Sequence, residues 1–369
     1  MKIESATIDN SAGKSAFHRM RSEFERAWRT HPDRRCESCC TFAGRTARLR
    51  LVGHGLSQHI GEAFGHLLIE MNPSIPSLKI DLWDQSATSI ACPVSSVSVE
   101  PRLLNTTSYV EFGLILASVD DRYIGCQRPQ IITWFDRCNQ HLVGWVSDHN
   151  ELSIYERGKP LHLPLLLWHS DQDTEVIHGA VVAKKGEGVL LAGRGGTGKS
   201  TAALTCVEAG FDYLGDDYIG LEMSADGSFR GHSLYSATWL MSDHLMRFPR
   251  LIPYAIFPER PERDKTLVLL SQVFPQQLLR SATICALVLP RITANPTAQI
   301  RPASKAEALF ALAPTSILLR PRAGAATLNK LACLAERVPC YWLDLGRNLS
   351  ETHVRLAQAM DFAPAGQPN

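Results

Sequence analysis

The strongest chemical signal in the chain is the sequence GRGGTGKS at residues 193–200. It matches the pattern G-x-x-x-x-G-K-[ST], in which glycines let consecutive backbone N–H groups turn inward around an anion. The apolar stretch VLLAG precedes the loop and the helical pattern KSTAALTCVEAG follows it. The loop is therefore predicted to join a buried strand to a helix N-terminus, where the helix dipole also favours negative charge. The pattern indicates a nucleotide bound through its phosphates.

Two side chains in this loop have predicted roles. Lys199 supplies a point charge for the β- and γ-phosphates, and the Ser200 hydroxyl is placed to hold Mg²⁺. The alternative is a glycine-rich strand-to-helix turn that binds nothing. The residues expected to contact the nucleotide are Gly193, Arg194, Gly195, Gly196, Thr197, Gly198, Lys199, Ser200 and Thr201.

An acidic pair, Asp216-Asp217, follows the strand-like sequence FDYLG, 17 and 18 residues after Lys199. One carboxylate of such a pair can hold Mg²⁺ while the other takes a proton from an incoming hydroxyl. Because neighbouring strand residues point to opposite faces, both can serve only if the strand ends there, as Gly215 allows. The alternative is a polar turn. His178 lies 21 residues before Lys199 in a predicted strand, where a lone histidine is usually part of the core.

Taken together, HGAVVAKKGEGVLLAGRGGTGKSTAAL followed by LGDDYIGLE resembles the HPr kinase/phosphorylase family, whose P-loop fold is shared with phosphoenolpyruvate carboxykinase. The resemblance is strong over residues 178–221 and weaker to the C-terminus. It implies that Asp216 is the general base that activates an acceptor serine and that Asp217 is the Mg²⁺ carboxylate. It also implies that His178 lies beside the pair and helps to set its protonation. The implied cofactors are ATP and Mg²⁺.

The sequence departs from that family at two loop positions and in one signature. Arg194 and Thr201 stand where HPr kinases usually carry an aspartate and a glutamate, and the Arg-Gly-rich signature is missing from residues 233–265. The chain looks closer to the HPr-kinase-like kinases of lasso-peptide maturation than to HPr kinase itself. The resemblance implies a protein or ribosomally made precursor peptide with an acceptor serine as substrate, and a homo-oligomeric assembly.

A basic residue downstream of the acidic pair could complete the site. Lys265 follows the proline-rich sequence FPERPERD, and a mobile lysine there could reach the transferred phosphoryl group and stabilise its charge. Arg263 is a competitor for that role. The alternative is a solvated loop charge.

The predicted fold is an α/β P-loop kinase core at residues 166–369, preceded by an α+β module at residues 1–165. Strands that alternate with helices after residue 174 indicate a largely buried sheet. In the N-terminal module, the spacing of apolar residues predicts a core-facing helix over 14–30. The strands predicted there are ARLRLVG, residues 78–84, YVEFGLILA, YIGCQ, QIITWFD and LVGWVSD, and LPLLLWH has the length of a core strand.

Three cysteines lie close together in a segment that reads as a polar turn, Pro32 to Cys40. Cys36, Cys39 and Cys40 could hold part of a zinc site with His31, but a tetrahedral site needs a fourth ligand and no second C-x-x-C is present. The alternative is two nearby surface thiols.

Composition excludes some classes of function. The 369 residues carry 38 basic and 37 acidic side chains, a net charge of +1, which argues against a protein that mainly neutralises nucleic-acid phosphates. Only 10 of the 38 cations are lysines. A polar N-terminus, the absence of a long apolar run and ten scattered cysteines predict a cytoplasmic protein that does not engage a membrane.

The favoured hypothesis is an ATP-dependent kinase that transfers the γ-phosphate to a serine hydroxyl. Two alternatives stay open. One is an ATP-binding sensor or regulatory module without transferase activity, whose partner or substrate binds residues 1–165. The other is a kinase of a small-molecule hydroxyl. A carboxykinase is disfavoured because the chain is short for that family and shows no second metal-ligand cluster.

Overall fold

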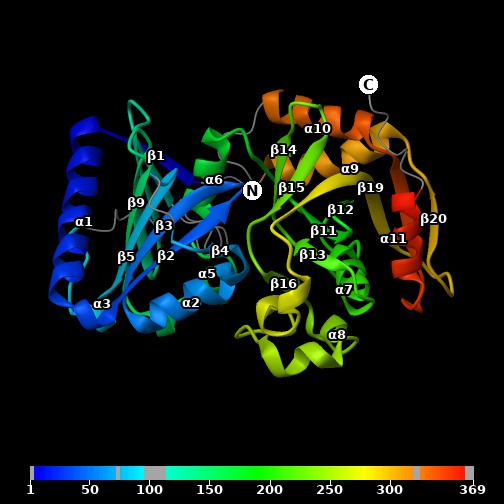
Figure 1. Ribbon diagram of the computed structural model, residues 1–369, viewed down its shortest axis with the longest axis horizontal. Helices are drawn as coiled ribbons and strands as arrows, with labels where there is room; N and C mark the ends of the chain where they lie inside the picture. The colour runs from blue at the N-terminus through cyan, green and yellow to red at the C-terminus, as the bar shows by residue number, and fades with distance from the viewer. Residues whose placement is uncertain (1–3, 72–74, 95–113, 319–324, 362–369) are drawn as a thin grey trace. The chain divides into compact units, whose positions relative to one another are not determined.

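The computed structural model describes residues 4–71, 75–94, 114–318 and 325–361. The chain divides into two compact units, Met1–Trp168 and His169–Asn369 (Figure 1). Each is an α/β unit with its own sheet and hydrophobic core. Among the described residues, no helix combines the length and apolar character needed to cross a membrane.

The first unit is built on a nine-stranded mixed sheet with the order β1-β6-β7-β8-β9-β5-β3-β2-β4. Its strands are β1 (Glu4–Ile8), β2 (Arg35–Phe42), β3 (Arg45–Val52), β4 (Leu68–Ile69), β5 (Leu78–Asp84), β6 (Leu114–Ser118), β7 (Tyr123–Arg128), β8 (Ile131–Asp136) and β9 (His141–Val146). The helices are α1 (Asn10–Thr30), α2 (His54–Phe64), α3 (Gln85–Thr88), α5 (Ile154–Gly158) and α6 (His162–Asp171), with 3₁₀ turns η1 (Pro32–Arg34), η2 (Gly65–Leu67) and η3 (His149–Glu151).

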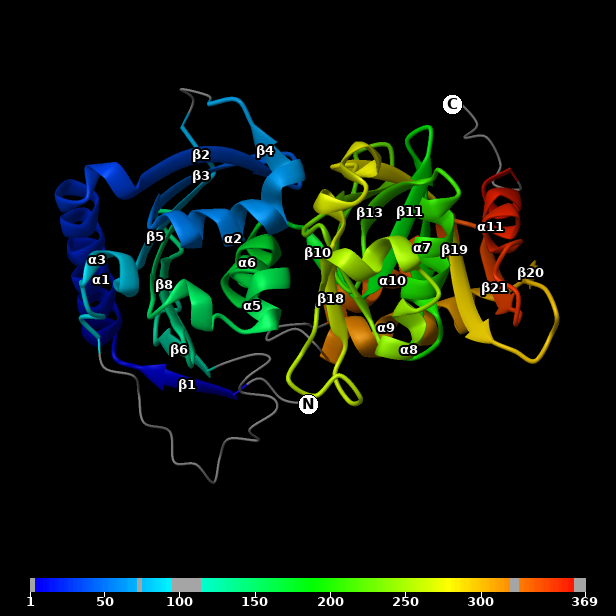
Figure 2. The same ribbon diagram turned by 90° about the horizontal axis from the view of Figure 1, so that it is seen from below.

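Helix α1 covers one face of this sheet, and Figure 2 shows α2, α5 and α6 on the other. Phe17, Met20 and Phe24 of α1 are fully buried and belong to one core cluster with Trp83 of β5 and Val143 of β9. The apolar stripe predicted from the sequence is therefore confirmed as a core-facing surface.

Two segments of this unit differ from the sequence-based prediction. The segment predicted as a polar turn holds η1 and then β2, because its residues pair in register with β3 from Arg35 to Phe42. LPLLLWH is not a strand but lies in α6. A short apolar run does not distinguish a buried strand from a buried helix, and Pro164 is tolerated in the first helical turn. Of the predicted strand YVEFGLILA, residues 109–113 lie outside the described residues.

The second unit contains the phosphate-loop sequence. Its strands are β10 (Glu175–Ile177), β11 (Gly179–Lys184), β12 (Glu187–Ala192), β13 (Asp212–Gly215), β14 (Ile219–Met223), β15 (Phe229–Ser233), β16 (Ala237–Leu240), β17 (Ala255–Ile256), β18 (Thr266–Leu269), β19 (Ser281–Ile292), β20 (Gln299–Pro302) and β21 (Cys340–Leu345). The helices are α7 (Lys199–Glu208), α8 (Ser242–Leu245), α9 (Lys305–Leu318), α10 (Ala325–Arg337) and α11 (Thr352–Asp361), with 3₁₀ turns η4 (Pro249–Tyr254), η5 (Leu270–Gln272) and η6 (Pro275–Gln277).

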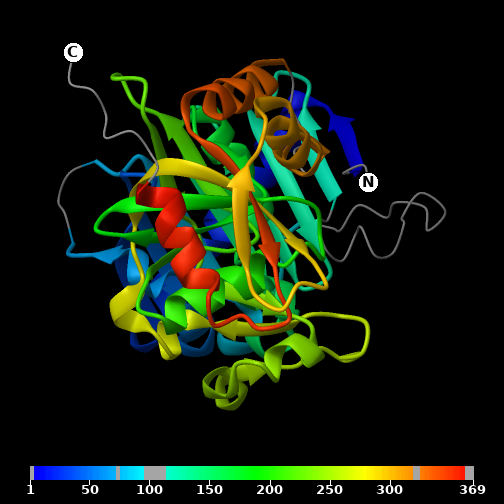
Figure 3. The ribbon, with the colours of Figure 1, turned by 90° about the vertical axis from the view of Figure 1, so that its right-hand side faces the viewer.

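Helices cover both faces of the main sheet, whose strand order is β10-β14-β15-β19-β12-β11-β13, with β21 beside β19 and β20 beside β21. One core cluster joins the sheet to α7 and α11, and another joins it to α9 and α10. Figure 3 shows α11, in red, lying against strands of the main sheet. The predicted alternation of strands and helices is confirmed, as is the capping box at the start of α9, in which Ser304 and Glu307 bond to each other's backbone N–H.

The register of β11 brings three distant segments to one end of the sheet. Gly179 at the start of β11 pairs with Ala192 at the end of β12, and Val181 pairs with Gly215 at the end of β13. Because both pairings are antiparallel, the residues after β12 and after β13 lie beside the residue before β11. That residue is His178, which separates β10 from β11 rather than lying within one predicted strand.

Candidate phosphate-binding site

The loop between β12 and α7 has the backbone conformation that its glycines predict. Gly193, Gly196 and Gly198 have φ angles of +150°, +81° and +98°, a range that side chains disfavour. A Cβ at Gly198 would also overlap Leu345 Cδ1. The first helical residue is Lys199, so the free N–H groups of the first turn of α7 follow directly on the loop. Arg194, Gly195 and Gly196 are exposed, so a ligand has access from solvent.

The Lys199 ammonium is held inside the curve of this loop. Its Nζ donates to the carbonyl oxygens of Gly193 at 2.8 Å and of Arg194 at 3.1 Å. Burial lowers the pKa of Lys199, the negative charge of Asp216 opposes this shift, and the positive charge of Lys265 adds to it. A buried cation that the fold does not fully compensate is suited to pair with an anionic ligand.

The other polar side chains of the loop are fixed to different degrees. Thr197 donates from Oγ1 to the Arg194 carbonyl at 3.0 Å, which closes the loop on itself. Thr201 Oγ1 lies 3.3 Å from His244 Nδ1. Within the described part of the chain, the half-buried Ser200 hydroxyl has no hydrogen-bond partner. A hydroxyl without an intramolecular partner at the start of α7 is the kind of oxygen ligand that a phosphate-bound Mg²⁺ takes.

The acidic pair lies in a turn, not in a strand. β13 ends at Gly215, and Asp217 has a φ of +75°, so the two carboxylates are released from strand alternation. Asp216 is 5% exposed. Its Oδ1 accepts from the Asp217 N–H at 2.9 Å, and its Oδ2 accepts from Thr238 Oγ1 at 3.0 Å. The position of the Asp216 carboxylate is thus fixed by hydrogen bonds to both oxygens.

His178 belongs to the same group. Its Nε2 lies 3.1 Å from Asp217 Oδ1, and its backbone N–H donates to Ser316 Oγ at 3.3 Å. The His178 ring also makes an edge contact with Tyr218, with ring centroids 6.2 Å apart. The structure therefore brings His178 to the acidic turn, as the resemblance implied.

Lys265 and Arg263 are both exposed in the segment before β18. Lys265 is close enough for its charge to act on Lys199, whereas Arg263 is not among the groups that shift the pKa of Lys199. β18 pairs with β16, which carries Thr238, so the strand that starts after Lys265 is joined to the strand that holds Asp216 in place. This arrangement favours Lys265 over Arg263 as the additional cation of the site.

Sequence reasoning missed two polar side chains of this site, Thr238 and His244. Thr238 lies in the apolar strand β16 and His244 in the short helix α8. Neither belongs to a recognisable motif, because each reaches the site through tertiary packing. The only signal for Thr238 is a hydroxyl inside the buried sequence YSATWL, where it needs an acceptor.

The cysteine cluster does not form a metal site among the described residues. Cys36, Cys39 and Cys40 lie on β2, where Cys39 and Cys40 are neighbours that point to opposite faces. Cys39 and Cys40 are buried, so the alternative of surface thiols is wrong for both of them. Burial raises the pKa of Cys40 above its usual value.

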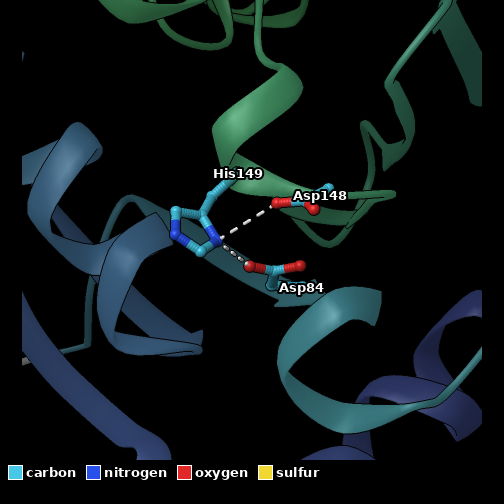
Figure 4. Close-up of side chains that lie close together, drawn as sticks. All are labelled: Asp84, Asp148 and His149. Carbon is cyan, nitrogen blue, oxygen red and sulfur yellow. Dashed lines mark hydrogen bonds and ion pairs between the residues drawn. The ribbon is translucent and has the colours of Figure 1, made fainter.

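A different group of metal-ligating side chains occurs in the first unit, at Asp84, Asp148 and His149. Figure 4 shows both carboxylates facing Nδ1 of His149. His149 Nδ1 lies 2.6 Å from Asp84 Oδ2 and 3.6 Å from Asp148 Oδ1. Asp84 caps α3 through the Ser86 N–H, and Asp148 caps η3 through the Asn150 N–H. These hydrogen bonds explain the group as a structural feature, in which His149 joins two helix-capping carboxylates.

Comparison with known proteins adds little to this geometry. No protein-family model matches the chain, and no curated protein is similar to it in sequence. Among solved structures, the Hpr(Ser) kinase/phosphatase from Coxiella burnetii aligns with a TM-score of 0.28 and 13% identity, over 50% of this chain and 95% of that chain. At this TM-score the alignment does not establish a shared fold.

Proposed function

We propose that the second unit is an ATP-dependent phosphotransferase whose acceptor is a serine hydroxyl of a protein or of a precursor peptide. The observation that carries the proposal is the juxtaposition of the 193–200 loop with Asp216, Asp217 and His178 at one end of β11. A loop for phosphates and a carboxylate pair for metal and proton are the parts that phosphoryl transfer requires. The sequence resemblance to HPr-kinase-like kinases supports the same reaction.

In the proposed mechanism, the loop N–H groups and Lys199 bind the β- and γ-phosphates of ATP. Asp216 takes the proton from the acceptor hydroxyl as that oxygen attacks the γ-phosphorus, and the bond from the γ-phosphorus to the bridging oxygen breaks to release ADP. Ser200 and Asp217 would hold Mg²⁺, which neutralises phosphate charge when bound. His178 orients Asp217, and Lys265 stabilises the charge of the transferred group.

The hydrogen bonds of Asp216 support its role as base. Its two oxygens are aimed by the Asp217 N–H and the Thr238 hydroxyl, so the carboxylate does not have to reorganise before it accepts a proton. Asp217 is more exposed and lies in a left-handed turn that frees its carboxylate from the sheet. These environments suit a fixed base and an accessible metal ligand.

Transfer of label from γ-labelled ATP to serine-containing proteins and peptides tests the proposal. Asp216→Asn keeps the size of the side chain and removes its basicity, so we expect transfer to fall by about 10²–10⁴-fold with little change in ATP affinity. Equal transfer by Asp216→Asn and the unmodified protein would remove Asp216 from the role of base.

The alternative of a nucleotide sensor is favoured by one observation, the exposed Arg194 at the loop position where HPr kinases usually carry an acidic residue. Calorimetric titration with MgATP beside the transfer assay separates the two functions. Tight binding without transfer to any acceptor would favour the sensor, and transfer to a free hydroxy compound would favour a small-molecule kinase. Absence of ATP binding would contradict all three.

A further inference from the structure

The first unit contains a pocket of about 500 Å³ between α1 and the α1-facing side of its sheet. This volume falls in the range of about 300–1,000 Å³ that small-molecule sites occupy. Two carboxylates, Glu25 and Asp136, line the pocket. Against them, six basic side chains line it, namely Lys14, Arg21, Arg48, Arg50, Lys79 and Arg122. In a chain with a net charge of only +1, this local surplus of cations is not a result of overall composition.

The carboxylates around the pocket are already engaged by two of the arginines. Arg50 donates to both oxygens of Asp81, at 2.9 and 2.7 Å, and to Glu25 at 2.7 Å. Arg122 donates to both oxygens of Asp136, at 3.2 and 3.3 Å. Burial opposes ionisation of Asp81, but hydrogen bonds from His141 and Arg50 lower its pKa, so it stays charged and fully used. The two carboxylates that line the pocket, Glu25 and Asp136, therefore already have arginine partners.

Among the described residues, three of the remaining four cations lack a partner, and the fourth, Arg48, has one ion pair at 3.9 Å. Across the described ranges of the chain, the side chains of Lys14, Arg21 and Lys79 have no hydrogen-bond or ion-pair partner. Arg48 approaches Glu37 only at 3.9 Å, and its Nε is buried without an acceptor. A buried donor that lacks an acceptor costs free energy unless a ligand or water supplies one.

The sheet places these charges side by side. Arg48 on β3 is in register with Lys79 on β5, and Lys79 is in register with His141 on β9. Arg48 and Lys79 are like charges on adjacent strands and repel each other, so an anion bound beside both would relieve that repulsion. Lys14 and Arg21 of α1 face the same pocket, two helical turns apart.

We propose that this pocket is a second anion site, distinct from the 193–200 loop, and that it binds a small molecule carrying two or more phosphate groups. A pyrophosphate-like group offers several acceptor oxygens to cations that line one pocket from a helix and two strands. The arginine forks of Arg21 and Arg48 are suited to phosphate geometry, and the lysines add point charges. The fixed Arg50–Asp81 and Arg122–Asp136 pairs hold the walls in place before the ligand arrives.

Calorimetric titration of the full chain with inorganic pyrophosphate tests the proposal. The unmodified protein should bind two pyrophosphates, one in each unit, and Lys199→Ala should leave one. In the Lys199→Ala background, Arg21→Gln or Lys79→Gln should weaken the remaining site by about tenfold or more. Arg19→Gln is the matched control, because Arg19 lies on the same helix outside the pocket, and it should leave the affinity unchanged. Raising the salt concentration should weaken binding.

Thermal unfolding shows whether a variant that binds pyrophosphate weakly is still folded. Without added phosphate, Lys79→Gln should unfold at the same or a higher temperature than its parent, because it removes the repulsion between Lys79 and Arg48. Pyrophosphate should raise the Tm of Lys199→Ala but not of Lys199→Ala with Lys79→Gln. Equal affinities of the Arg21, Lys79 and Arg19 variants, or absence of binding by Lys199→Ala, would overturn the proposal. So would tighter binding of a hexaglutamate peptide than of pyrophosphate, since it would assign the pocket to an acidic peptide.

Discussion

His178 Nε2 lies 3.1 Å from Asp217 Oδ1, a contact between residues 39 positions apart in the chain. The two residues meet because the antiparallel pairing of β11 with β13 brings the start of one strand to the end of the other. The same end of β11 pairs with the end of β12, which leads into the 193–200 loop. One strand thus positions the histidine, the acidic turn and the phosphate loop together.

Asp217→Asn tests the metal role of this carboxylate. The amide keeps the size of the side chain and a hydrogen-bonding oxygen near His178, but it removes the charge that attracts a divalent cation. We expect MgATP affinity to fall by about 10–100-fold, with ATP affinity in the absence of Mg²⁺ unchanged or higher. Titrations with and without Mg²⁺ measure this difference. An Asp217→Asn protein that retains the Mg²⁺ dependence of the unmodified protein would instead assign the metal to another residue.

Lys199→Met separates the stability of the loop from its function. The pKa of Lys199 is lowered, first by burial, so the folded state disfavours the ammonium relative to water. Methionine has a similar length and no charge, and without nucleotide we expect it to raise the Tm. MgATP should raise the Tm of the unmodified protein but not that of the variant. A lower Tm for ligand-free Lys199→Met would show that its hydrogen bonds to the loop outweigh the desolvation cost.

The pH dependence of this effect has a defined sign. Between the lowered pKa of folded Lys199 and the usual value of 10.5, the unfolded chain binds more protons than the folded chain. The free energy of unfolding should therefore gain a positive slope with pH across that alkaline window, and Lys199→Met should lose this slope. Nucleotide affinity should change in the opposite direction, because deprotonation removes the cation that binds phosphate. Denaturant titrations at several alkaline pH values measure the first effect.

Gly198→Ala tests the backbone requirement of the loop. With φ at +98° and Leu345 Cδ1 in the path of a Cβ, alanine at this position should cost about 1–2 kcal/mol of stability from the backbone conformation alone. MgATP affinity should fall with it, because the amides lose their alignment. Gly195→Ala is the matched control, since a Cβ there meets no atom within 4 Å and the φ of Gly195 is not positive. Similar losses for both variants would contradict a steric cause specific to Gly198.

The parts of the site that could be predicted from sequence are those encoded locally. The GRGGTGKS loop, its flanking strand and helix, and the end of a strand at Gly215 all follow from short-range patterns, and the structure confirms these elements. The sequence VIHGAVVAK predicts one strand over residues 176–184, whereas the structure has β10 and β11 on either side of His178, because both pieces are apolar and only their different partners separate them. In the same way, the neighbours of Thr238, Arg48 and Lys79 depend on which strands pair, and sequence periodicity carries no information about that.

Lys265→Ala tests whether a cation outside the loop acts on the transferred group. Lys265 is exposed, its charge acts on Lys199, and it precedes the strand paired with the one that carries Thr238. If Lys265 stabilises charge that develops during transfer, its loss should lower the transfer rate by about 10²-fold and leave ATP affinity nearly unchanged, because the contact forms mainly in the transition state. Arg263→Ala, two residues away and also exposed, should have little effect on either quantity. A parallel loss of ATP affinity in Lys265→Ala would mean that the lysine binds the ground-state phosphates, and a larger effect of Arg263→Ala would transfer the role to the arginine.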